Sequence, residues 1–277
     1  MLKSTMVPHA AMPATTQDAA VYQLNSGGKR ARAHLAIHAS TALNLSPADA
    51  LSTLATAELV PNASLVHDDL QDRDRSRNDV GSAWATFGEG VSIGSSDVLL
   101  SSAHCALSGI SHSQTLPTLI SLERERVSDA CIDQCANLTN ELPTTVTAEV
   151  YERLAALKSG PLLSLPMELA LAACGQVQAL PAMQKTADSV AIGYQIFDDL
   201  NGMQGDVCRP DFQPAINAVE VLESINVNSD PVTLAKNLAP MHSAIAAEWS
   251  LELANDCGQF RHLLAVDLNA QIRSASA

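Results

Sequence analysis

Aromatic residues are scarce in this chain of 277 residues, in which Phe, Trp and Tyr together make up 3%. The apolar fraction of 47% therefore rests mainly on Ala and Leu. These residues lose little side-chain entropy in a helix, whereas strands favour aromatic and β-branched residues. No Pro-, Gly- or Ser-rich linker divides the chain. We therefore expect an all-α fold and a single domain over residues 1–277.

Positive charge is also scarce, with 16 Lys and Arg against 30 Asp and Glu, which gives a net charge of −14. Because nucleic-acid affinity depends largely on clusters of Lys and Arg, this composition argues against a nucleic-acid partner. An anionic ligand would have to be met by local positive charge or by a metal ion.

Paired cysteine motifs and long apolar runs are absent as well. The six cysteines include no CxxC pair, which favours reduced thiols in a cytosolic protein. No apolar run reaches the roughly 18 residues of a membrane span, and the first ten residues lack a signal-peptide core. We therefore expect a soluble, cytoplasmic protein without a membrane span.

Helical patterns recur along the chain. A helix over about 47–70 is predicted by Ser46 as N-cap, Pro47 at the first helical position and apolar residues at spacings of three and four. A second segment, 148–175, contains Pro161 and Pro166, so we expect two helices there or one helix broken at "KSGP".

Further helices are predicted over 183–206, which ends in paired acids, and in the tail 231–277.

An acidic cluster ends the first of these helices, in "SLVHDDLQD". Asp68 and Asp72 stand at i and i+4 and so share a helix face, while Asp69 points about 100° away. The C-terminal end of a helix favours cations, and Mg²⁺ prefers one or two carboxylates together with waters and phosphates. A solvated acidic helix end is the alternative interpretation of this cluster taken alone.

Two further features favour a metal-diphosphate site. "FDDLNGMQGD" supplies Asp198, Asp199 and Asp206 after another apolar helical run, and two such clusters on facing helices could hold several Mg²⁺ ions and a diphosphate. Near the N-terminus, "NSGGKRARAH" places a compact set of bases after a Gly pair.

These motifs together resemble those of the trans-polyprenyl diphosphate synthases, over about residues 25–210. "GGKRARA" is similar to the family's GGKRxRP, "SLVHDDLQD" to its first Asp-rich motif, and "RNDVGSAWATFG" to RRGxPTxWxxFG. "LKSGPLL" is similar to KTGxLL, and "GYQIFDDL" to the start of the second Asp-rich motif. The resemblance implies a bundle of about a dozen helices around a deep central cavity, and a homodimer.

The activity that this resemblance implies is Mg²⁺-dependent prenyl transfer. An allylic prenyl diphosphate ionises, isopentenyl diphosphate attacks the allylic cation, and loss of a proton gives a longer trans-prenyl diphosphate. Metal and basic groups stabilise a departing diphosphate, and an apolar cavity keeps water from the cation.

The resemblance also implies roles for individual residues. Asp68, Asp72 and Asp198 would be direct Mg²⁺ ligands, and Asp69 and Asp199 supporting ligands or acids behind them. Asp206 of the second cluster is a further candidate metal ligand. Arg77 and Lys158 would hold the allylic diphosphate, and Lys29 and Arg32 the isopentenyl diphosphate. Gln195 would line the reaction centre, and Ala63 and Ser64 would face the growing chain, where small side chains leave room for about fifteen to twenty carbons or more.

Some positions depart from the family's pattern. Pro61 stands where the family carries a His, Asn78 replaces the second Arg of the RR pair, and Gly202 replaces the third Asp of the second motif. In the family, the first two of these positions help to bind isopentenyl diphosphate, so the resemblance implies that the allylic, metal-binding half is better preserved than the isopentenyl half. Two alternatives to chain elongation are a class I terpene cyclase or irregular-coupling enzyme, and a catalytically weak or regulatory relative that binds a partner.

Overall fold

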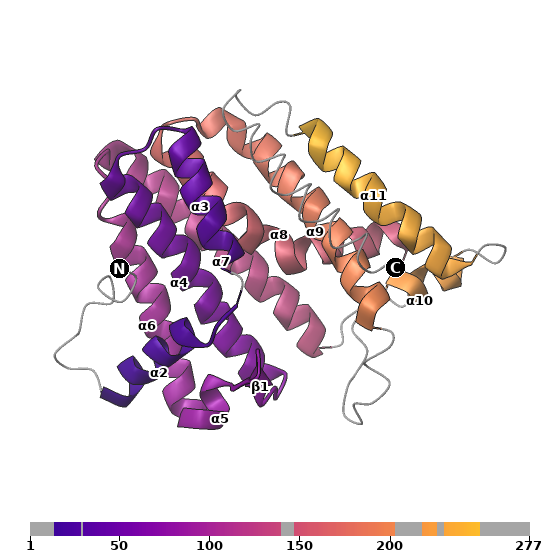
Figure 1. The fold of residues 1–277 in the computed structure, drawn as a ribbon, viewed down its shortest axis with the longest axis horizontal. Coiled ribbons are helices and arrows are strands. Elements are labelled where there is room, and N and C mark those ends of the chain that lie inside the picture. Colours follow the sequence, from indigo (N-terminus) through magenta and orange to yellow (C-terminus); the bar gives the residue numbers. More distant parts are fainter. Residues whose placement is uncertain (1–13, 29, 140–146, 203–217, 226–229, 250–277) are drawn as a thin grey trace. The chain divides into compact units, whose positions relative to one another are not determined.

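The computed structural model describes residues 14–28, 30–139, 147–202, 218–225 and 230–249 (Figure 1). Over these residues it contains ten α-helices, two short 3₁₀ helices and one two-stranded hairpin, which confirms the all-α prediction. The chain forms two compact units, 1–127 with 165–177 and 128–164 with 178–277. The single-domain organisation over residues 1–277 stays a prediction.

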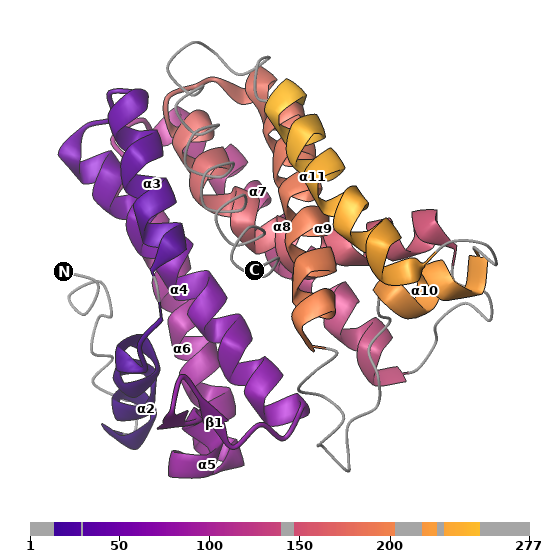
Figure 2. The same cartoon turned by 45° about the vertical axis from the view of Figure 1, so that its right-hand side comes forward.

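The first unit is built around α4 (Pro47–Gln71). α4 packs along α6 (Glu89–Leu107) and against α3 (Ala31–Ala42), and α2 (Ala14–Asn25) packs against α6 (Figures 1 and 2). The short α5 (Ala83–Phe87) joins α6, and η1 (Ser113–Thr115) leads into α7 (Leu116–Thr139). Fully buried leucines, among them Leu59 and Leu99, form the core of this unit.

α4 begins as the sequence predicts, and Figure 1 shows it as one long helix. Ser46 Oγ accepts the Asp49 N–H at 3.2 Å and donates to Asp49 Oδ2 at 2.8 Å. Asp49 Oδ1 also accepts the Ser111 N–H at 2.6 Å. The Ser46 side chain thus satisfies one orphan N–H of the first turn, and the buried Asp49 adds favourable charge at the helix's positive end.

A hairpin that the sequence analysis did not anticipate follows α4. β1 (Ser76–Arg77) and β2 (Val80–Gly81) pair antiparallel, with Ser76 opposite Gly81. Asn78 and Asp79 form the turn with φ of 51° and 62°. Two consecutive left-handed residues are typical of a type I′ turn, in which Asn and Asp are favoured. The dipeptide Asn78–Asp79 was therefore the signal in the sequence.

The second unit is centred on α9 (Leu180–Gly202), which packs along α11 (Pro231–Trp249) (Figures 1 and 2). α10 (Ala218–Ile225) packs on both, and η2 (Val177–Ala179) precedes α9. A buried apolar cluster joins these helices to the start of α8 (Ala148–Ala173); it includes Tyr151, Ala155, Ile192, Ile196, Val219, Val221 and Leu222.

The prediction of a break at "KSGP" is wrong, because α8 runs without interruption from Ala148 to Ala173. Each proline removes one helical N–H donor, which ordinarily costs about 3 kcal/mol in a helix interior. Extensive burial offsets this cost: Leu165, Met167, Leu169 and Leu171 are all almost fully buried. Tertiary packing therefore outweighs the local preference of the two prolines.

Two acids of the first unit are buried in different ways. Glu168 on α8 accepts hydrogen bonds from Arg126 Nε and Nη2 on α7, at 2.7 and 2.8 Å. Glu123 on α7 has both carboxylate oxygens buried without a hydrogen-bond partner, and His104 Nε2 lies 3.4 Å from one of them. Burial raises the pKa of Glu123 to about 7, and the nearby His104 opposes that shift.

None of the helices in the described ranges has both the length and the apolar character needed to cross a membrane. Cys105, Cys131 and Cys174 form no disulfide among the described residues; Cys105 and Cys131 are exposed, so they are not the core thiols that the sequence suggests. The side chain of Cys135, and all of Cys208 and Cys257, lie outside what the structure describes.

Candidate active site

The first acidic cluster lies at the carboxyl end of α4. Asp68 is partly buried, and Asp72 is exposed and forms the C-cap, with its N–H donating to the Asp68 carbonyl at 2.8 Å. That helical bond places the two residues one turn apart on one face. The final turn of α4 carries no basic residue, so positive charge near the two carboxylates comes from outside the helix, with Arg77 of the following hairpin acting on Asp68.

Asp69 is turned the other way and is buried, with 1% of its surface exposed. Arg77 donates to its Oδ1 from Nε at 2.8 Å and from Nη2 at 2.6 Å. Burial raises the pKa of Asp69 above its ordinary value, although the Arg77 guanidinium opposes the shift. Asp69 therefore fixes Arg77 beside the cluster, and its role as a supporting acid of a metal site stays a prediction.

Trp84 anchors the segment that carries Arg77. Its indole N–H donates to the Asp74 carbonyl at 2.8 Å. The guanidinium groups of Arg73 and Arg75 lie over the ring, 5.6 and 5.4 Å from its centroid. These contacts hold residues 73–75, which follow α4 directly. Trp84 of "RNDVGSAWATFG" therefore has a structural role.

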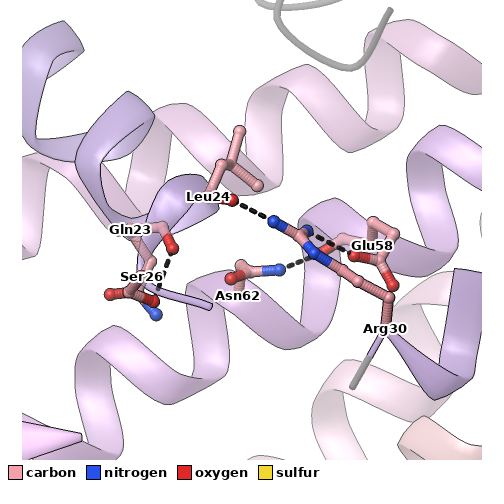
Figure 3. Close-up of polar contacts among 6 residues, drawn as sticks. All are labelled: Gln23, Leu24, Ser26, Arg30, Glu58 and Asn62. Carbon is pink, nitrogen blue, oxygen red and sulfur yellow. Dashed lines mark hydrogen bonds and ion pairs between the residues drawn. The ribbon is translucent and has the colours of Figure 1, made fainter. Parts of the chain in front are cut away.

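Arg30 of the basic loop donates hydrogen bonds to two other segments of the first unit (Figure 3). Its Nη1 donates to Glu58 Oε2 on α4 at 2.7 Å, and its Nη2 donates to the Leu24 carbonyl at the end of α2. Glu58 is buried, so this bond gives a buried carboxylate its counter-charge. Arg30 is thus the structural base of "GGKRARA", and Arg32 is partly buried at the start of α3.

The Gly pair of the basic loop lies against the hairpin turn. Gly27 and Gly28 have φ of 99° and 96°, which strains any other residue. A Cβ on Gly28 would lie 3.9 Å from Asn78 Nδ2. The structure therefore brings the basic loop together with Asn78, the position that the family resemblance assigns to the same subsite. Lys29 lies outside the described residues.

The two residues expected to face the growing chain differ in their surroundings. Ala63 is 1% exposed, and its carbonyl accepts the hydroxyl of Ser96 on α6 at 2.9 Å. Ser64 is only partly buried and stands one turn before Asp68, on the same face of α4. Pro61 is buried within α4, without breaking it. Ser64 therefore lies on the face of α4 that carries Asp68 and Asp72, whereas Ala63 is buried against α6.

The second acidic cluster closes α9 in the other unit. The Asp199 carboxylate accepts hydrogen bonds from Tyr151 Oη and the Ala218 N–H, both at 2.8 Å, and from Gln195 Nε2 at 2.7 Å. Gln195 is buried. Asp198 belongs to α9, but its side chain is not among those the structure describes, and Asp206 lies in a segment outside it.

Lys158 is exposed on α8, two residues before a close approach between α8 and α9. A Cβ on Gly160 would lie 2.8 Å from Asp188 Oδ1 on α9 and 3.8 Å from the Ala191 Cβ. The glycine of "LKSGPLL" thus lies where α8 approaches α9, and a side chain at this position would have to displace the Asp188 carboxylate.

Comparison with known proteins identifies the family. The model of the polyprenyl synthetase family matches residues 13–209. The chain belongs to the polyprenyl synthetase family. It is 30% identical over 229 residues to a geranylgeranyl diphosphate synthase of Mycobacterium tuberculosis, covering 80% of this chain and 65% of that relative. It is 28% identical over 188 residues to a short chain isoprenyl diphosphate synthase of Methanothermobacter thermautotrophicus, covering 68% of this chain and 58% of that relative.

Solved structures show the same fold. A geranylgeranyl pyrophosphate synthetase of the archaeon Geoglobus acetivorans superposes with a TM-score of 0.82 at 20% identity, covering 98% of this chain and 95% of that one. The polyprenyl synthetase chain thus has the family's fold, although it spans only 65% and 58% of the two curated relatives above.

The donor set of this polyprenyl synthetase family member fits Mg²⁺. In the part of the chain that the structure describes, no three His, Cys, Asp or Glu side chains are grouped to hold a metal ion. Asp68 and Asp72 nevertheless supply hard oxygen donors on one helix face, and Mg²⁺ needs only one or two carboxylates when phosphates and waters complete its shell.

Proposed function

We propose that this protein is a Mg²⁺-dependent prenyltransferase that condenses an allylic prenyl diphosphate with isopentenyl diphosphate to a longer trans-prenyl diphosphate. The observation that carries the proposal is the pair Asp68 and Asp72 on one face at the carboxyl end of α4, with Arg77 fixed beside it by Asp69, in a chain of the polyprenyl synthetase family. Homodimeric assembly stays a prediction from the family resemblance, and a cytoplasmic location stays a prediction from the sequence.

Asp68, Asp72 and Asp198 are the proposed Mg²⁺ ligands. Bound Mg²⁺ supplies positive charge that stabilises the diphosphate as a leaving group. Arg77 and the exposed Lys158 add positive charge for the allylic diphosphate. Because Arg77 already donates to Asp69, its orientation is fixed before substrate binds, which removes part of the ordering cost.

Lys29 and Arg32 are the proposed partners of isopentenyl diphosphate. The contact between Gly28 and Asn78 supports this placement, because it joins the basic loop to the turn that carries the family's second diphosphate-binding position. Gln195 is the proposed reaction-centre residue, held by Asp199.

One observation favours a second candidate, an enzyme that ionises a single prenyl diphosphate and does not use isopentenyl diphosphate. Pro61 and Asn78 replace two bases of the isopentenyl subsite. Pro61 lies inside α4, and Asn78 adopts a left-handed backbone conformation in the hairpin turn.

The experiment that separates the two candidates is incubation with Mg²⁺ and prenyl diphosphates of increasing length, with and without isopentenyl diphosphate. Free diphosphate and prenyl products are both measured. Longer prenyl diphosphates that appear only with isopentenyl diphosphate support elongation, whereas hydrocarbon and diphosphate formed without it support the second candidate. No diphosphate release from any substrate contradicts both.

The same assay tests the acidic clusters. Asp68→Ala and Asp198→Ala should abolish Mg²⁺-dependent diphosphate release, because each removes a proposed ligand. Asp97→Ala, which removes an exposed acid on α6, is the control and should retain the rate. Unchanged release by both cluster variants would contradict the ligand assignment.

A further inference from the structure

The Asp199 carboxylate connects helices α8, α9 and α10. Its Oδ2 accepts the Tyr151 hydroxyl of α8 and the Ala218 N–H of α10, both at 2.8 Å. Its Oδ1 accepts Gln195 Nε2, one turn earlier on α9, at 2.7 Å. A carboxylate offers about four lone-pair sites, so these bonds use most of its capacity.

The bond to Ala218 gives a backbone N–H at the amino-terminal end of α10 its acceptor, at the first residue of this helix that the structure describes. The first N–H groups of a helix have no partner within the helix, and its N-terminal end favours negative charge. Asp199 satisfies both requirements from a different helix, so the position of α10 depends on the orientation of this carboxylate.

Tyr151 sets that orientation. It is 6% exposed, and its ring packs in the apolar cluster with Ile196 and Leu222. A packed ring holds its hydroxyl at a fixed point, and a buried hydroxyl without a partner is costly. The Tyr151 hydroxyl therefore aims at Asp199 from a rigid site.

Asp199 in turn orients Gln195. An ionised carboxylate only accepts hydrogen bonds, so the Gln195 atom facing it is the amide nitrogen, and the carbonyl oxygen points elsewhere. Asp199 thereby selects one of the two amide orientations of a buried glutamine.

We propose that Tyr151 is a positioning residue that acts through Asp199: it holds the carboxylate where it orients the Gln195 amide and caps α10, and Asp199 is not a direct Mg²⁺ ligand. The catalytic consequence rests on the proposed function, because it needs Gln195 at the reaction centre. The hydrogen-bonded hub itself does not depend on that function.

A double-mutant cycle tests the hub without any activity measurement. Tyr151→Phe should raise the unfolding equilibrium constant roughly tenfold, as expected for a hydrogen bond to a charged group. In the Asp199→Ala background the same change should have almost no effect. Tyr22→Phe is the control: its hydroxyl donates to the Gly81 carbonyl at 2.7 Å in the other unit, so its effect should be equal in both backgrounds.

Hydrogen exchange gives a local readout that does not depend on a clean unfolding transition. Protection of the amides of 218–225 should fall in Asp199→Ala and, to a smaller extent, in Tyr151→Phe. Equal effects of Tyr151→Phe in both backgrounds, or unchanged protection in both variants, would overturn the hub.

The Mg²⁺ dependence of diphosphate release tests the catalytic part. Tyr151→Phe and Asp199→Asn should lower kcat while leaving the Mg²⁺ concentration for half-maximal rate unchanged, whereas Asp68→Asn should raise that concentration. A rise in Asp199→Asn as large as that in Asp68→Asn would show that Asp199 binds the metal and would overturn the proposal. If the wild type releases no diphosphate, the proposed function fails, while the cycle and the exchange data still decide on the hub.

Discussion

The buried pair Arg126 and Glu168 should show a strong asymmetry between single and double substitution. The two side chains are 7% and 0% exposed, and two parallel bonds of 2.7 and 2.8 Å join them. Solvent screening of this pair is therefore small. Arg126→Met or Glu168→Met alone would leave a buried charge without its counter-charge, and we expect a loss of about 3–5 kcal/mol in the free energy of unfolding.

The double substitution of Arg126 and Glu168 by Met should cost much less, about 0–2 kcal/mol, because both desolvated charges are removed and similar volume is kept. Urea unfolding of the wild type, both single variants and the double variant measures this. The exposed pair Arg73 and Glu89, with side chains 63% and 58% exposed, is the control, and its neutralisation should change stability by about 0–1 kcal/mol. A double variant as unstable as the sum of the two single variants would refute the reasoning.

Three further outcomes follow from buried positions. The pKa of Glu123 is raised to about 7 in the native state, whereas the unfolded chain releases this proton near pH 4.5. The free energy of unfolding should therefore fall as pH rises through that interval. Glu123→Gln should flatten this fall in a pH series of urea midpoints. Gly90→Ala, whose added methyl group meets nothing within 4 Å, should stabilise by about 0.5–1 kcal/mol in the same unfolding assay. Gly160→Ala should gain less, because its methyl group must displace the Asp188 carboxylate, whose Oδ1 it would approach to 2.8 Å. Ser64→Phe should shorten the prenyl product. Ala63→Phe should mainly lower the melting temperature, because Ala63 is buried where α4 packs along α6. A stable Ala63→Phe variant that gives a shorter product would contradict this difference between the two positions.

Local signals in the sequence were sufficient for α4. Ser46, Pro47 and Asp49 act within one turn, so their pattern predicts the helix start without knowledge of the fold. The unbroken α8 could not be predicted in this way, because the prolines disfavour a helix locally and only the burial of the surrounding apolar side chains reverses that preference.

Contacts between residues far apart in the sequence were likewise beyond sequence reasoning. The family pattern singles out the basic loop but does not show that Arg30 pairs with Glu58, 28 residues later. Tyr151 and Asp199 are 48 residues apart, and nothing in the composition around Tyr151 marks it as a partner of an acidic motif. Such pairings depend on which helices pack together, which the motifs alone do not specify.

The acidic motifs themselves show a related limit, which arises from helix geometry. Consecutive residues on a helix point about 100° apart, so two adjacent aspartates have different surroundings. The sequence motif alone does not distinguish between them. In the first cluster, Asp69 points inward and is bound by Arg77, while Asp68 shares its face with Asp72. In the second, Asp199 is bound by Tyr151 and its neighbours. The second Asp of each pair thus binds donors of its own chain, which is the arrangement expected if the acid behind the ligand fixes the local structure on which metal binding depends.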